Sequence, residues 1–123
     1  MPSVRNKPRV LSAATLSGYL VRTGDNEDLG AVEELMIDPE TGRVQYAVLS
    51  IGSLFGFGGK LHAVPWDILR LDSDRRAFVL HADRETLEAA PAFDEDNWPD
   101  FGDADWKHRI DSHYGLLPQR NAA

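Results

Sequence analysis

The sequence predicts a mainly β fold, a small barrel of about six strands with one or two short helices after it. Short apolar segments follow one another at close spacing between residues 16 and 82, as is typical of small barrels. Polar turn sequences separate these segments, and two of the turns begin with Asp38 and Asp72. After residue 83 the pattern changes, because helix-capping residues precede two short helical segments.

The expected strands are short and vary in their apolar pattern. They cover Leu20–Thr23, Leu29–Ile37, Val44–Ile51, Lys60–Pro65, Ile68–Leu71 and Ala77–His81. The alternation along Leu29–Ile37 is imperfect, as in a curved barrel strand. Asp38 and Pro39 suit the first two places of a type I turn, and Gly42 can take the left-handed conformation that closes a bulged hairpin.

The strand Val44–Ile51 is apolar on both of its faces. Val44, Tyr46 and Val48 share one face, while Ala47, Leu49 and Ile51 share the other. One face can fill the barrel, and the second needs cover from the C-terminal segment, a partner, or another copy of the chain. We take Ala47, Leu49 and Ile51 as the candidate dimer face or lid-covered face.

Two helices are expected after the strands, and they form a candidate lid. Asp83 can cap a helix at Arg84–Ala90, which Pro91 ends. Asp103 can cap a second helix at Ala104–Tyr114, with Gly115 in the C-terminal capping position. Aromatic side chains supply the candidate anchors of this lid on the barrel, namely Trp98, Phe101 and Trp106.

These elements predict one domain with a tail at each end. We expect a flexible tail at 1–14, the barrel at 15–82, an acidic helical extension at 83–115 that packs on the barrel, and a second flexible tail at 116–123. The formal net charge is −7, and residues 83–105 contain nine acids and a single base, Arg84. Such a surface disfavours phosphate backbones, so we expect no nucleic-acid partner.

The chain has no cysteine and no apolar stretch long enough to cross a bilayer, which favours the cytoplasm.

The glycine-rich segment between Gly52 and Lys60 does not fit a phosphate-binding loop. Leu61 stands where a Walker loop needs serine or threonine, and Leu54 stands where it needs its first glycine. The segment therefore predicts an apolar loop, in which Leu54, Phe55 and Phe57 either fold over the barrel mouth or form a partner-binding loop.

The sequence contains no recognisable catalytic or metal-binding motif. The acids after Asp25 and Asp94 miss required positions of a calcium loop, and His108 and His113 are five residues apart, too far to share a helix face. Asp111 and His108 are better explained as an exposed ion pair. We therefore expect no catalytic residues, no cofactor and no metal, and a protein that is not an enzyme.

Three stretches of the sequence together resemble a known family. They are Asp28–Asp38, Thr41–Ser50, and Ala63-Val64-Pro65-Trp66, in this order. They are similar to the PRC-barrel family, which is named for the cytoplasmic domain of the photosynthetic reaction centre H subunit. The tail with Phe93, Trp98 and Trp106 looks like that of a stand-alone bacterial subgroup.

The resemblance implies a compact β-barrel that acts as a docking module. We expect a non-enzymatic protein-interaction module, a homodimer, with a protein partner whose identity the sequence does not give. The alternative is an accessory protein of membrane electron transfer or of a reaction centre-like complex, docked peripherally on that complex, in which acids with His62 or His81 relay protons.

Overall fold

The structure, a computed structural model, describes residues 10–51 and 60–116, and its main element is one seven-stranded sheet. The strands are β1 (Leu20–Thr23), β2 (Asp28–Asp38), β3 (Arg43–Ile51), β4 (Leu61–Pro65), β5 (Leu69–Asp72), β6 (Ala77–Leu80) and β7 (Ala92–Phe93). The helices are α2 (Ala13–Leu16), the 3₁₀ turn η1 (Trp66–Ile68), α3 (Arg84–Ala89) and α4 (Ala104–His113). The mainly β fold class with short C-terminal helices is thus confirmed.

The order of the strands in the sheet is β5-β6-β1-β2-β3-β4-β7. All neighbours are antiparallel except β1 and β6, which run parallel. Within the described residues the sheet is open, with β5 and β7 as its end strands. The sequence did not predict β7, because two residues give no alternation to detect.

The expected strand and helix positions are confirmed to within a few residues. Asp83 and Asp103 cap α3 and α4 through hydrogen bonds from the backbone amides of Thr86 and Asp105. The single turn α2 was not predicted, although Ser12 caps it by accepting a hydrogen bond from the Thr15 amide.

The imperfect alternation of β2 has a structural cause. Val32 pairs with Leu49 and Glu34 pairs with Val48, so the register shifts and Glu33 has no directly opposite residue. Such a bulge exchanges the faces of all residues that follow it. As a result, Val32 and Leu35 both reach the interior although their sequence parity differs.

The two faces of β3 carry two separate apolar clusters. Ala47 and Leu49 belong to the interior cluster, whose buried members are Leu16, Val21, Leu29, Val32, Ala47, Leu49, Val64, Phe78, Leu80 and Leu87. Tyr46 and Val48 belong to the outer cluster, whose buried members are Tyr46, Val48, Leu61, Ala63, Phe93, Trp106 and Ile110. Of the covers considered for the second face, the C-terminal segment is the one that the structure shows.

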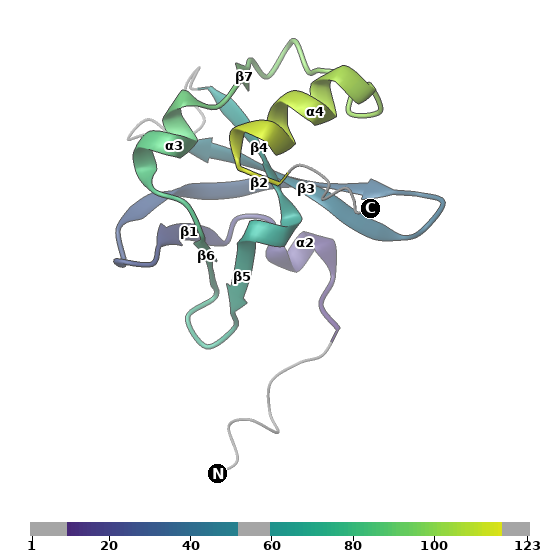
Figure 1. The fold of residues 1–123 in the computed structure, drawn as a ribbon. Helices are drawn as coiled ribbons and strands as arrows, with labels where there is room; N and C mark the ends of the chain where they lie inside the picture. Colours follow the sequence, from purple (N-terminus) through teal and green to yellow (C-terminus); the bar gives the residue numbers. More distant parts are fainter. Residues whose placement is uncertain (1–9, 52–59, 117–123) are drawn as a thin grey trace.

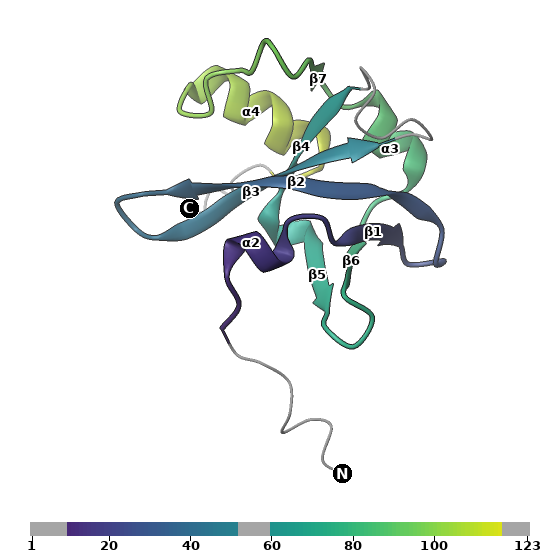
Figure 2. The same cartoon turned by 180° about the vertical axis from the view of Figure 1, so that it is seen from behind.

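Helix α4 provides much of this cover. It lies over β3 and β4, while α2, β5 and β6 lie on the opposite side of the β2–β3 hairpin (Figure 1; seen from behind in Figure 2). Trp106 and Ile110 lie one turn apart on α4, so both side chains point into the outer cluster. The hairpin itself extends beyond the rest of the sheet (Figure 1).

Candidate functional site

The tip of the β2–β3 hairpin has a well-defined turn. The Gly42 amide donates to the Asp38 carbonyl at 2.7 Å, and the Glu40 amide donates to Oδ1 of Asp38 at 2.9 Å. Gly42 has φ +77°, the left-handed conformation expected from the sequence. The turn fixes where Ile37 and Glu40 lie beside the sheet.

A second register shift bends the hairpin below its tip. Ile37 pairs with Val44 but Met36 pairs with Tyr46, which leaves Gln45 without an opposite residue. Ile37 is 49% exposed, whereas Tyr46 is buried beneath the C-terminal segment. The bend therefore places an exposed apolar side chain next to the outer cluster.

Aromatic rings hold the C-terminal segment against this part of β3. The ring of Trp106 lies 4.6 Å from that of Phe101 and 5.4 Å from that of Tyr46, measured between centroids. Phe101 also contacts Phe93 and Trp98, each at 6.1 Å. The start of α4 is thus fixed opposite the hairpin.

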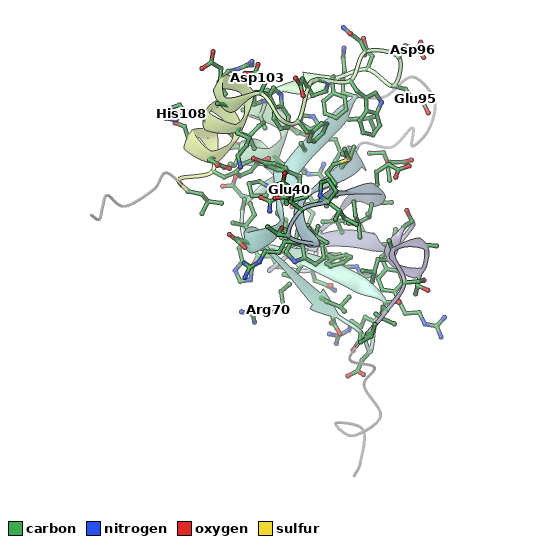
Figure 3. The ribbon with its side chains drawn as sticks, turned by 90° about the vertical axis from the view of Figure 1, so that its right-hand side faces the viewer. Glu40, Arg70, Glu95, Asp96, Asp103 and His108 are labelled. Atoms are coloured by element: carbon green, nitrogen blue, oxygen red, sulfur yellow. The ribbon has the colours of Figure 1, made fainter. Side chains whose placement is uncertain are left out.

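Between the hairpin and this segment lies an open groove of about 570 Å³, called here the hairpin groove. It is lined by Met36, Ile37, Asp38, Pro39, Glu40, Gln45, Tyr46, Phe101, Gly102 and Lys107. The apolar part comes from Met36, Ile37, Pro39, Tyr46 and Phe101. Figure 3 looks onto this side of the molecule, with Glu40 near the centre and Asp103 at the start of α4.

A smaller hollow of about 110 Å³ adjoins the groove and shares Gln45, Tyr46 and Lys107 with it. In it, the Tyr46 hydroxyl donates a long hydrogen bond of 3.5 Å to Oδ1 of Asp111. Burial, with the charge and hydrogen bond of Asp111, raises the pKa of Tyr46 to about 12. Burial also raises the pKa of Asp111, with a contribution from Asp67, although Lys107, Tyr46 and His108 act in the opposite direction. A phenol with this pKa stays protonated at neutral pH, so Tyr46 can act as a hydrogen-bond donor but not as a base.

The histidines do not gather at this groove. His62 is buried on β4, and its Nδ1 has no hydrogen-bond partner among the residues that the structure describes. Burial lowers its pKa, with opposing effects from Glu88, which raises it, and His113, which lowers it. His81 and His108 are exposed, and Asp111 faces Tyr46 instead of forming the expected ion pair with His108. In residues 10–51 and 60–116 no three metal-ligating side chains form a group.

The residues selected from the sequence have different positions. Leu54, Phe55 and Phe57 lie outside the described residues. Ala47 and Leu49 are fully buried in the interior cluster, against which Ile51 also packs, so α4 covers the opposite face with Tyr46 and Val48. Trp106 is buried, Phe101 is partly buried, and Trp98 is 36% exposed.

The sequence reasoning did not select Met36, Ile37 or Tyr46 as site residues. Their apolar character was visible, but the bulge at Gln45 that leaves Ile37 at the surface has no sequence signal. The closeness of Asp111 to Tyr46 depends on how α4 docks, which spacing along the chain does not give.

By its fold, the protein is a small mainly β domain, in which one curved sheet is covered by short helices. A family model for the PRC-barrel domain matches residues 8–87, so the chain belongs to the PRC-barrel family, as the resemblance indicated. No curated protein matches the chain. The matched residues end within α3, so Phe101, Gly102 and Lys107, which line the groove from the start of α4 and the segment before it, follow the family domain. None of the helices in the described part of the chain is long and apolar enough to cross a membrane.

Proposed function

We propose that the protein is a non-enzymatic docking module that binds a partner protein in the hairpin groove, in the cytoplasm. The observation that carries this proposal is the half-exposed Ile37 at the edge of an open groove of about 570 Å³. An apolar side chain in such a concave place gains free energy when a partner covers it, about 25 cal/mol for each Å² of apolar surface removed from water.

The scaffold supports this role. The groove walls belong to two elements held by the outer cluster, so they are formed before a partner arrives and little ordering accompanies binding. The Lys107 ammonium and the Gln45 amide offer hydrogen bonds beside the apolar floor, which is the usual composition of a specific binding surface.

The test is quantitative affinity purification from the native cell with three versions of the protein as bait. These are the wild type, Ile37→Glu in the groove, and Leu71→Glu, which changes another exposed apolar side chain on β5 away from the groove. We expect at least one protein to be retained by the wild type and by Leu71→Glu and lost with Ile37→Glu. Equal recovery of every co-purifying protein with all three baits would contradict the groove as the docking site.

The proposal includes a homodimer. Because both faces of β3 are covered within the chain, the dimer needs another surface. Leu20 on β1 is 40% exposed, and it pairs with the partly buried Ala31 on the face of the sheet away from the interior cluster. A second copy can cover this patch. Light scattering should give a dimer for the wild type and a monomer for Leu20→Asp, whereas a wild-type monomer at micromolar concentration would reject the dimer.

A further inference from the structure

The chemistry around the hairpin groove indicates which kind of partner segment it accepts, an inference that rests on the proposed docking function. The inner surface of the groove is apolar. Met36 and Ile37 line it from the hairpin, and Phe101 lines it from the C-terminal segment. Ile37 is about half exposed while Tyr46 beside it is buried, so Ile37 offers an open apolar position in the groove. That position suits one or two aliphatic or aromatic side chains of a partner.

The rim of the groove is predominantly acidic. Asp38 and Glu40 line it from the hairpin, and the adjoining hollow adds Asp67 and Asp111, against the single base Lys107. Asp38 uses Oδ1 to accept the Glu40 amide, which holds the Asp38 carboxylate and the Glu40 backbone at the tip of the hairpin. Carboxylates next to an apolar floor favour a ligand that places a cationic side chain beside an apolar one.

The chain itself shows an apolar side chain next to this surface. Gly115 has φ +74°. Its amide donates to the backbone carbonyl of Ser112, and the Leu116 amide donates to the backbone carbonyl of Asp111 at 2.7 Å. This Schellman turn reverses the chain after α4 and places Leu116 in the hollow that it shares with Tyr46 and Asp111. The wall formed by Gln45, Tyr46 and Lys107 therefore already accepts a leucine on one side and remains open on the groove side.

We propose that the hairpin groove binds a linear segment of a partner protein in which one or two apolar residues are followed closely by lysine or arginine. The apolar side chains lie between Ile37 and Phe101, and the cationic side chain lies beside Asp38 and Glu40. The groove and the adjoining hollow together give the segment a continuous path along the hairpin.

The test uses two fluorescein-labelled heptapeptides that differ only in charge, one with two leucines followed by two arginines and one with two leucines followed by two glutamates. Fluorescence anisotropy measures their binding to the full chain. We expect the arginine peptide to bind at least about tenfold more tightly, a preference that weakens as salt is added.

Two charge-reversal variants locate the effect. Glu40→Lys removes a carboxylate of the rim, and Glu95→Lys makes the same change in net charge on an exposed acid at the margin of this side (Figure 3). The preference for the arginine peptide should disappear in Glu40→Lys and persist in Glu95→Lys. Both are exposed positions, so unchanged circular dichroism and melting temperature should show that both variants are folded.

Equal affinity for the two peptides, or an equal loss in both variants, would overturn the proposal, because net charge and not the groove would then decide binding. Binding that appears only after residues 117–123 are deleted would also overturn it, since the chain itself would then compete for the groove. If neither peptide binds while the purification still shows a partner that Ile37→Glu loses, the docking function stands and the linear segment does not.

Discussion

Two hairpin turns of the sheet have a left-handed residue at the same position, but the residue type differs. Gly42 follows Asp38 by four residues, and Arg76 follows Asp72 by four; both have positive φ, +77° and +54°. An L-residue in this conformation costs about 1 to 2 kcal/mol, which glycine avoids. Arg76 is therefore a strained position on the surface.

Replacing Arg76 by glycine should stabilise the protein by about 0.5 kcal/mol, because the released strain exceeds the added entropy of the unfolded chain. Chemical denaturation measures the change in the free energy of unfolding. The control is Arg76→Ala, which removes the same side chain and keeps the strain. If alanine stabilises as much as glycine, backbone strain is not the cause.

His62 makes stability depend on pH. Its folded-state pKa is lowered from 6.5 by burial, so the unfolded chain binds a proton more readily than the folded one. The unfolded state then holds more protons below pH 6.5, and the free energy of unfolding decreases as the pH falls through that range.

The prediction is a stability loss between about pH 7.5 and about pH 5.5 that is smaller in His62→Gln, measured by urea unfolding. Glutamine keeps a polar side chain of similar size but does not titrate. Carboxylates that titrate near the lower end of this pH range contribute equally to both proteins. The difference between the two slopes of unfolding free energy against pH therefore isolates His62. Equal slopes would exclude this histidine as the source.

At the level of the elements, the close approach of β2 to β3 depends on Gly30. A Cβ built there would lie 1.9 Å from the carbonyl oxygen of Ser50, a backbone atom that cannot move aside alone. Gly30→Ala should cost at least about 2 kcal/mol, because the two strands must separate. Gly24→Ala is the matched control, since a Cβ there meets nothing within 4 Å, and it should be neutral or slightly stabilising. Thermal unfolding of the two variants compares them directly.

The helical cover has unequal anchors. Trp106 is 8% exposed within the outer cluster, whereas Trp98 is 36% exposed and has ring contacts with Phe93 and Phe101. Trp106→Ala should cost about 3 to 5 kcal/mol and Trp98→Ala much less, as measured by denaturant unfolding. Similar losses would show that the cover is held along its whole length instead of at α4.

For the whole molecule, the two apolar clusters share β3 and therefore should unfold together. Tyr46 and Val48 face one cluster, and Ala47 and Leu49 face the other. With Trp66 and Trp98 replaced by phenylalanine, Trp106 fluorescence reports on α4, and far-ultraviolet circular dichroism reports on the sheet. The two melting curves should coincide. An earlier transition in fluorescence would show that α4 opens separately.

The sequence was sufficient for most of the fold because the decisive signals are local. Turn residues such as Asp38 and Gly42, and caps such as Asp83 and Asp103, act on their near neighbours and so could be read directly. The groove was not predictable in the same way. It depends on a bulge at Gln45 and on the contact between Tyr46 and Asp111, 65 residues apart, which arises only when the helix packs on the sheet.

The parallel pairing of β1 with β6 has a consequence for the order of events in folding. Leu20 to Thr23 must find Ala77 to Leu80, a separation of 57 residues, whereas β2, β3 and β4 pair with near neighbours. Joining distant segments requires closing a long loop, which slows that step relative to hairpin formation. During synthesis β1 leaves the ribosome early but one of its edges stays unpaired until β6 is made, so the central antiparallel strands assemble first.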